Sequence, residues 1–147
     1  MILSYEAMKK PKLPAGVLFH HDLQLLVYRP RGVLNEKIVN GIVAYLDQAE
    51  DKADKPFNRF TDLSKLKAIE LDMEYVCRVS LHRRQRYLNY PPVKSAFYVT
   101  AEKAAAIATA HAVITDQSPL QVAVFTEVAA AAKWLGVSTA DLRIGER

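Results

Sequence analysis

Four arginines are crowded into one short segment of the chain, at Arg78, Arg83, Arg84 and Arg86. The segment also holds His82 and contains no acidic residue. Because the chain has 20 Lys and Arg against 16 Asp and Glu, these four arginines account for the whole net charge of +4. Guanidinium groups bind carboxylates and phosphates through paired hydrogen bonds. The cluster therefore predicts either a solvated helix face or a surface that binds an acidic protein or an anionic ligand.

Nucleic acid is not the expected partner of this cluster. Tyr75, Tyr87 and Tyr90 lie close to it in the sequence, and guanidinium and aromatic groups together favour RNA. However, the arginines are spread around the predicted helix, and a net charge of +4 would release few counterions. We therefore expect nucleic-acid binding to be absent.

Asp62 and Ser64 form a second candidate site, because they follow a predicted central strand. In open α/β sheets, ligands bind in the crevice beyond the carboxyl ends of the strands. An Asp at such a point also commonly stabilises the loop by accepting hydrogen bonds from residues that follow it. The structural role is the favoured interpretation of Asp62, and ligand or partner binding by Asp62 and Ser64 is the alternative.

The remaining reactive residue types predict no catalytic residue, no metal site and no cofactor. His20 and His21 are adjacent on a strand, so their side chains point to opposite faces. His111 lies on the apolar stripe of a helix, which indicates a partly buried, hydrogen-bonded side chain. Cys77 is the single cysteine and is expected to be a small core residue. Neither a phosphate-binding glycine loop nor a nucleophile or zinc-protease motif is present in the sequence.

The composition indicates one compact domain that can bury a core without disulfides. The chain has 147 residues, of which 50% are hydrophobic and 24% are charged. Residues 1–16 contain Pro11, Pro14 and Gly16 and predict an extended arm, followed by an α/β domain over residues 17–147. One cysteine, no secretory signal and no apolar run long enough to cross a membrane favour a cytoplasmic protein.

Hydrophobic periodicity predicts alternating strands and helices in the order β-β-α-β-α-β-α-β-α. Strands are expected over residues 17–20, 23–28, 57–61, 95–99 and 121–125. Helices are expected after the capping residues Asn35, Asp72, Thr100 and Thr126, with Gly136 ending the last of them. This order predicts an α/β fold with a mixed, mainly parallel sheet, one antiparallel edge and helices against its faces.

The helix that carries the arginines has an apolar face on a helical wheel. The wheel places Met73, Val76, Cys77, Ser80, Arg84, Tyr87 and Leu88 on one face. Arg78, His82 and Arg86 fall on the opposite, outer face. A buried arginine without a partner is costly, so we predict that Arg84 pairs with a carboxylate such as Asp62 or extends its charge to solvent.

Several local signatures, taken in order, resemble the SpoIIAA-like family, a relative of the STAS domains of sulfate transporters and anti-sigma-factor antagonists. The matching segments are Arg31-Gly32, Thr61-Asp62-Leu63-Ser64, Val124-Phe125-Thr126-Glu127 and Lys133-Trp134-Leu135. The resemblance covers roughly residues 17–136. It implies a mixed sheet of four or five strands with helices, and a binding or regulatory role.

The sequence departs from that family at its regulatory serine. Antagonists of this type carry a phosphorylatable serine in an Asp-Ser-Ser-Gly-like segment at the start of the helix after the third strand. This chain has Glu70-Leu71-Asp72-Met73 there, so that phosphorylation switch is not expected. Asp72 is interpreted as an ordinary helix cap, with a fixed charge in place of a phosphoserine as the alternative.

Two functions from different classes follow from these observations. The first is a non-enzymatic, STAS-like regulatory module that acts through protein contacts, as a homodimer or with a partner protein. The alternative is a carrier for a small molecule or lipid, apolar or anionic, in a crevice between the sheet and the helices. The candidate ligand or partner surface comprises Asp62, Ser64, Asp72, Arg78, His82, Arg83, Arg84 and Arg86.

Overall fold

The computed structural model of the chain describes residues 13–143. Most of the predicted N-terminal arm, residues 1–12, therefore lies outside the described residues, and the division at residue 16 stays a prediction. Pro14 and Gly16 form a turn, because the amide of Val17 donates to the carbonyl of Pro14 at 3.2 Å. This turn leads directly into the first strand.

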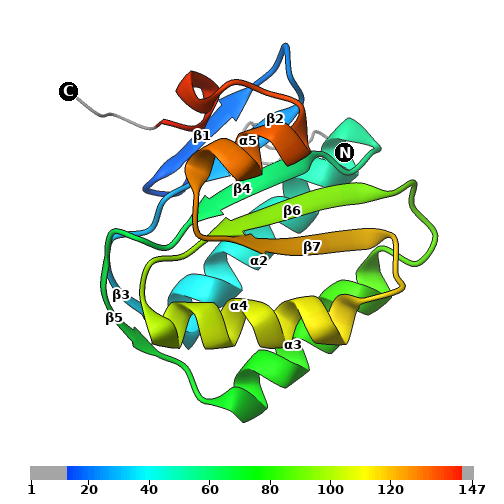
Figure 1. Ribbon diagram of the computed structural model, residues 1–147. Helices are drawn as coiled ribbons and strands as arrows, with labels where there is room; N and C mark the ends of the chain where they lie inside the picture. The colour runs from blue at the N-terminus through cyan, green and yellow to red at the C-terminus, as the bar shows by residue number, and fades with distance from the viewer. Residues whose placement is uncertain (1–12, 144–147) are drawn as a thin grey trace, which may run out of the picture.

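The described chain alternates strands and helices (Figure 1). The strands are β1 (Val17–His20), β2 (Leu25–Tyr28), β3 (Gly32–Asn35), β4 (Asn58–Asp62), β5 (Leu66–Glu70), β6 (Val93–Tyr98) and β7 (Leu120–Phe125). The helices are α2 (Glu36–Ala53), α3 (Met73–Arg86), α4 (Glu102–Thr115), α5 (Val128–Leu135) and the 3₁₀ helix η1 (Thr139–Leu142).

Five of the strands form one sheet in the order β1-β2-β4-β6-β7. β1 and β2 are antiparallel, whereas β2, β4, β6 and β7 are parallel to one another. The mixed, mainly parallel sheet with one antiparallel edge is therefore confirmed. The first strand pair is a hairpin, as predicted, but β2 begins at Leu25 because Gln24 takes a turn conformation with φ +50°.

Two strands were not predicted. β3 and β5 pair in parallel as a separate two-stranded sheet, and only Leu34 and Ile69 of these strands are buried. Such short strands show no alternation of polar and apolar residues that would distinguish them from loops. They lead into α2 and α3, and so they bring the first turns of these two helices together (Figure 1).

Two of the predicted helix caps are confirmed and two are wrong. Asn35 accepts from the amide of Ile38 at 3.0 Å, and Asp72 accepts from the amide of Tyr75 at 2.8 Å. Helices α4 and α5 instead begin after Ala101 and Glu127, which make no side-chain capping bond. At these two ends the chain enters the helix one residue later than the threonines suggest. Gly136 ends α5 with φ +76°, as predicted.

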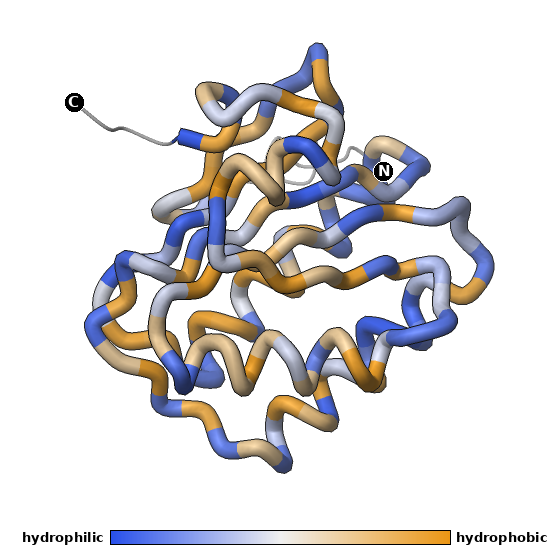
Figure 2. Tube along the Cα trace, in the orientation of Figure 1, coloured by the Kyte–Doolittle hydropathy of each residue, from blue (hydrophilic) through white to orange (hydrophobic). Residues whose placement is uncertain are grey.

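Helices cover both faces of the five-stranded sheet (Figure 1). On one face, α5 and η1 pack on Leu25, Val27, Phe60 and Ala96. On the other face, α2 packs on β2, and α4 packs on β7. Figure 2 shows α4 as hydrophobic along most of its length, as expected for a helix with neighbours on two sides.

Helix α3 lies farther from the sheet and packs mainly against α4. Its buried side chains are Tyr75, Val76, Ser80 and Arg83, with Tyr87 at its C-terminal end. The predicted inner face was wrong in part, because Met73 and Leu88 are each 47% exposed and Cys77 and Arg84 are half-buried. The buried side of the helix is shifted from the predicted side toward Arg83, since Arg83 is buried through polar partners that a hydropathy pattern does not show.

No helix among residues 13–143 is both long and apolar enough to cross a membrane.

Candidate functional site

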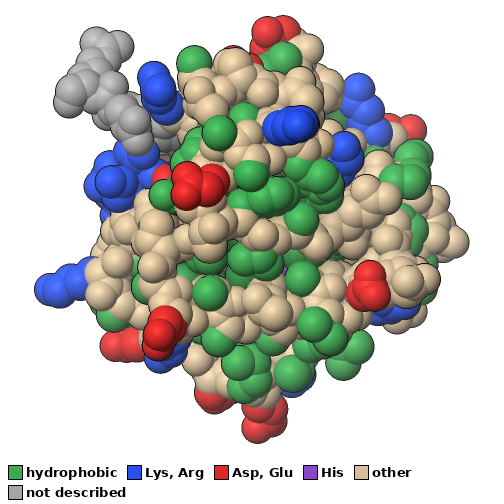
Figure 3. Space-filling model, in the orientation of Figure 1, with side chains coloured by type: hydrophobic (Ala, Val, Ile, Leu, Met, Phe, Trp, Pro, Cys, Tyr) green, Lys and Arg blue, Asp and Glu red, His purple; other side chains and the backbone are tan. Residues whose placement is uncertain are grey.

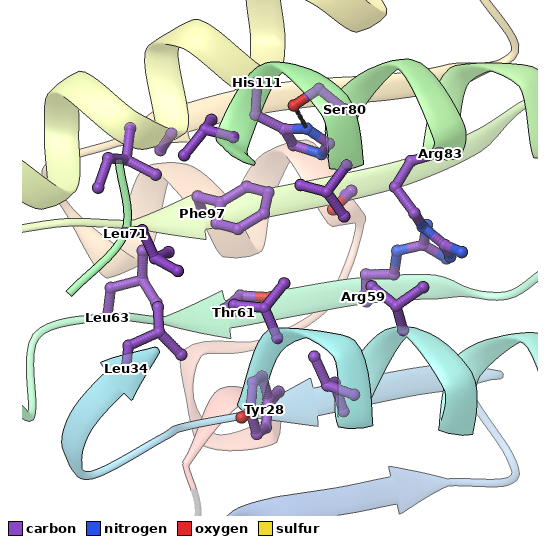
Figure 4. A pocket seen from close by; sticks show the side chains of 18 of the residues that line it. Tyr28, Leu34, Arg59, Thr61, Leu63, Leu71, Ser80, Arg83, Phe97 and His111 are labelled. Atoms are coloured by element: carbon purple, nitrogen blue, oxygen red, sulfur yellow. Dashed lines mark hydrogen bonds between the residues drawn. The ribbon is translucent and has the colours of Figure 1, made fainter. Parts of the chain in front are cut away.

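A cavity of about 150 Å³ lies between the sheet and helices α2, α3 and α4. It exists because α3 stands beside α4 rather than on the strands, so side chains of α3 reach across toward the sheet (Figure 4). Strands β2, β4 and β6 form its floor through alternate residues that face the helices. The cavity offers a small molecule contacts with both apolar and polar groups.

Most of the cavity wall is apolar. Val39, Ile42 and Val43 of α2 line one side, at the spacing of three and four residues that keeps them on one helix face. These side chains are only half-buried, although they point into the domain. Figure 4 shows Leu34, Leu63 and Leu71 gathered at one end and Phe97 over the middle. This end of the cavity offers contacts to hydrocarbon groups.

The opposite end of the cavity is polar. There the hydroxyl of Ser80 on α3 and Nδ1 of His111 on α4 are 2.7 Å apart (Figure 4). The ring of Phe97 lies against that of His111, with 5.6 Å between centroids and an interplanar angle of 80°. His111 is therefore hydrogen-bonded and packed, as its position in the sequence predicted.

Arg59 of β4 enters the same end and is held by a buried carboxylate. Its Nη1 donates to Oε2 of Glu50 at 3.2 Å and is close to the carbonyl of Phe57 at 3.4 Å. Glu50 is only 1% exposed, and its Oε2 also accepts from the amide of Phe57. Its Oε1 accepts from the hydroxyl of Tyr87, so both carboxylate oxygens have partners. Burial raises the pKa of Tyr87, which keeps this hydroxyl protonated and able to donate.

Arg83 of α3 connects this network to the outside of α2. Its Nη1 donates to Oδ1 of Asp47 at 2.6 Å, and its Nη2 donates to the hydroxyl of Tyr87 at 2.6 Å. The guanidinium groups of Arg59 and Arg83 lie 5.0 Å and 5.1 Å from the centre of the Tyr87 ring. Arg86 adds ion pairs to Asp47 and Asp51. The network thus fixes the C-terminal half of α3 to α2 and β4.

The electrostatic environment of His111 is positive. Burial, followed by the charges of Arg59 and Arg83, lowers the pKa of His111 from 6.5 to about 4. The ring is therefore neutral at pH 7. A general base works best when its pKa is close to the working pH, so His111 is a weak base for Ser80 at neutral pH. The pair is suited to hold a polar atom by hydrogen bonds.

Two hydroxyl groups of the cavity have no protein partner within the described chain. Thr61 of β4 and Ser95 of β6 line the cavity, and neither side chain hydrogen-bonds to a described residue. Ser95 is 3% exposed and pairs in register with Arg59 across the two strands. Both hydroxyl groups are therefore available to bind a polar atom in the cavity.

The predicted surface residues of α3 occupy different environments. Arg83 is buried, Arg86 is paired with α2, and Arg84 donates to the carbonyls of Ile114 and Asp116 at the end of α4. Arg84 thus has a partner, as predicted, but the partner is the last carbonyls of α4, which are unpaired acceptors with partial negative charge, rather than a carboxylate such as Asp62.

Arg78 and His82 are exposed, and Arg78 lies over the Tyr75 ring at 5.6 Å.

Asp62, Ser64 and Asp72 lie apart from the arginines and stabilise their own segments. Oδ1 of Asp62 accepts from the amide and the hydroxyl of Ser64, at 2.8 Å and 2.6 Å. Its Oδ2 is 4.0 Å from Nη1 of Arg29. The favoured structural interpretations of Asp62 as a loop residue and of Asp72 as a helix cap are thus confirmed. A role of these residues in binding stays a prediction.

Sequence reasoning missed Arg59, Thr61, Ser95 and the pairing of Ser80 with His111. The sequence does contain a signal for the ion pairs between α2 and α3. Asp47, Glu50 and Asp51 are spaced by three and four residues, which places three acidic groups on one face of α2 opposite the arginines of α3. The hydroxyls had no signal of their own, because Thr and Ser are common in strands of any exposure.

Comparison with known proteins gives one informative result. No protein-family model matches the chain, and no curated protein matches it by sequence. Among solved structures, the chain is similar to an uncharacterized protein of the DUF3478 family with a SpoIIAA-like fold, from Shewanella loihica PV-4. The likeness has a TM-score of 0.52 and 16% sequence identity, and it covers 82% of this chain and 90% of that one. With its mixed α/β architecture, this chain has a SpoIIAA-like fold.

Proposed function

We propose that this protein binds a small, largely apolar molecule in the cavity between its sheet and helices α2, α3 and α4. The observation that carries the proposal is an interior space of about 150 Å³ with an apolar wall and one polar end. In other proteins an apolar cavity of about this volume binds benzene or xenon. The expected ligand is therefore compact, with one ring or a short branched chain.

The energetics of packing support an occupant. An unfilled apolar space forgoes the dispersion energy of the contacts that an occupant would make with its wall. The ion pairs of Arg59 with Glu50 and of Arg83 with Asp47 hold α3 in a position that keeps the space open. A ligand that fills the space would recover this energy as binding energy.

Thermal shift measurements with a cavity-filling variant test the proposal. Val79 of α3 lines the cavity, and Val79→Phe places a ring into it; Val113→Phe makes the same change at a site on α4 that is 70% exposed. Toluene, phenol, benzoate and isobutyrate serve as probes. We expect at least one probe to raise the Tm of the wild type and of Val113→Phe by several degrees, and to leave Val79→Phe unchanged.

Equal shifts in wild type and Val79→Phe would place binding elsewhere and refute the proposal, as would the absence of any shift. Mass analysis of small molecules extracted from the purified protein provides an independent measurement. Recovery of a compact apolar compound from the wild type and not from Val79→Phe is the supporting result.

A protein-interaction module is a second candidate function, and the outer side of α3 favours it. Met73 and Leu81 of α3 and Leu88, just after its end, are 47%, 57% and 47% exposed. Hydrophobic side chains gather in the lower part of the molecule, where α3 and α4 lie side by side (Figure 3). An exposed apolar stripe of this kind is typical of a contact surface. The occupant expected from the sequence is a second copy of the chain or a regulatory protein.

Native mass spectrometry over a range of concentrations distinguishes the two candidates. A homodimer that Leu81→Lys converts to a monomer would support the interaction role. Gln48→Lys, at an exposed position on α2, is the matched control and should leave the dimer intact. A strict monomer at all concentrations would count against self-association. Under both candidates the proposal places the protein in the cytoplasm, because its single cysteine cannot form an intramolecular disulfide.

A further inference from the structure

We infer that the cavity takes its ligand as an anion, and that this ligand is a small organic carboxylate of about the size of benzoate, bound through Arg59 and Ser95. The inference rests on the proposed function, because it specifies the class of molecule that occupies the cavity.

The first support is the unused donor capacity of Arg59. This side chain is 4% exposed and lines the cavity, yet its hydrogen bonds to Glu50 and Phe57 all run through Nη1. Nε and Nη2 bond to no described residue, and neither is an atom fully enclosed by protein. Guanidinium groups bind carboxylates through two parallel N–H donors. Nε and Nη2 form such a pair.

The second support is the position of Ser95 beside Arg59. The two residues are register partners on the neighbouring parallel strands β4 and β6, and both face α3. Thr61 follows Arg59 by two residues and therefore lies on the same face of the sheet. A carboxylate has about four lone-pair sites on its two oxygens. It can therefore accept from the guanidinium of Arg59 and from a neighbouring hydroxyl at once.

The third support is electrostatic. Arg59 and Arg83 are the charged groups that lower the pKa of His111. Asp47, the carboxylate partner of Arg83, lies on the outer side of the network and is 28% exposed. Glu50 is already saturated by Arg59, Tyr87 and the amide of Phe57. Each guanidinium thus has a carboxylate partner, and an anion on the cavity side of Arg59 gains from the N–H donors that Glu50 leaves unused.

The apolar wall selects a carboxylate with a hydrocarbon body over inorganic phosphate. Leu34, Leu63 and Leu71 lie at the end away from Arg59, with Phe97 over the middle, and these side chains offer no group that could replace lost water around an ion (Figure 4). A volume of about 150 Å³ suits one ring with one carboxylate.

Titration calorimetry with matched probes tests the inference. The probes are benzoate, its neutral isostere benzamide, and inorganic phosphate. Arg59→Lys keeps the positive charge but loses the paired N–H donors, and Ser95→Ala removes the neighbouring hydroxyl. Thr109→Val, on the exposed side of α4, is the control variant. We expect the wild type and the control to bind benzoate at least ten times more tightly than benzamide. Arg59→Lys should lose ten-fold or more in benzoate affinity, and Ser95→Ala several-fold, with benzamide binding changed by less than two-fold.

Each other outcome has a defined meaning. Equal binding of benzoate and benzamide overturns the anion inference and leaves the proposed function standing. Phosphate that binds as tightly as benzoate overturns the choice of a carboxylate. Failure of benzoate, benzamide and the apolar probes alike overturns the proposed function itself. Circular dichroism checks the fold of each variant. If Arg59→Lys does not fold, the benzoate affinity of Ser95→Ala tests the inference, because Ser95→Ala removes one hydroxyl and no ion pair.

Discussion

The hydroxyl of Ser80 and Nδ1 of His111 lie 2.7 Å apart and join α3 to α4 beside the cavity. Because the pKa of His111 is lowered from 6.5 to about 4, the unfolded chain takes up a proton between these pH values and the folded protein does not. The free energy of unfolding should therefore fall as the pH drops from 6.5 to 4, by up to about 3 kcal/mol from this residue, and be unaffected above pH 7.

Urea unfolding at several pH values measures this effect. His111→Gln keeps a hydrogen-bond acceptor for Ser80 but cannot titrate, so its stability should depend less steeply on pH between 6.5 and 4 than that of the wild type. His82→Gln alters an exposed histidine and should behave as the wild type does. A His111 pKa near 6.5 in an NMR titration would show that the ring is not held neutral by its surroundings.

Ligand binding should raise the pKa of His111. The charged groups that act on the ring are Arg59 and Arg83, and both oppose protonation. A carboxylate bound at Arg59 adds a negative charge close by, which favours the imidazolium form. NMR titration with saturating benzoate should move the pKa of His111 from about 4 toward 6.5. An unchanged pKa in the presence of bound benzoate would locate the carboxylate away from the polar end.

Removal of the Glu50 charge should be strongly destabilising. Glu50 is 1% exposed and accepts hydrogen bonds from Phe57, Arg59 and Tyr87, which connect α2 to β4 and α3. Glu50→Ala leaves a buried guanidinium without its carboxylate and should cost about 3–5 kcal/mol in chemical denaturation. Asp51→Ala removes a pair with Arg86 in which the carboxylate is 61% exposed, and should cost less than about 1 kcal/mol. Similar losses for both variants would contradict this account.

Gly16 should not tolerate a side chain. It has φ +81°, and a Cβ built on it would lie 2.5 Å from the carbonyl oxygen of Arg29. Because Gly16 also accepts from the amide of Arg29 at 2.8 Å, the two segments cannot separate without loss of that bond. Gly16→Ala should lower the free energy of unfolding by more than about 2 kcal/mol. Gly136→Ala, at φ +76° with open space around it, should cost about 1 kcal/mol.

Much of the fold was predictable because the capping residues and the hydrophobic periodicity of the sequence indicate the same order of strands and helices. Asn35 and Asp72 cap α2 and α3 through the hydrogen bonds that their residue types predict. The alternation of strands and helices then determines a mainly parallel sheet. β3 and β5 were not predictable, because their pairing depends on the approach of two short segments that are distant in sequence.

The candidate site was less predictable than the fold, since it depends on how helices pack. The sequence predicts a surface position for Arg83 because arginine is usually exposed, whereas Asp47 and Tyr87 allow it to be buried. The contact between Ser80 and His111 arises from the placement of α3 against α4, which no periodicity in either helix specifies. Arg59 and Ser95 meet only through strand register.

The attachment of α3 to α2 includes ion pairs that partly reach solvent at Asp47, Asp51 and Arg86. Dissolved ions weaken such pairs far more than they weaken the apolar contacts of the sheet with α5. Ionic strength should therefore act on one helix of this protein selectively. In hydrogen exchange, the amides of α3 should lose protection as salt is added, while those of the central strands keep theirs.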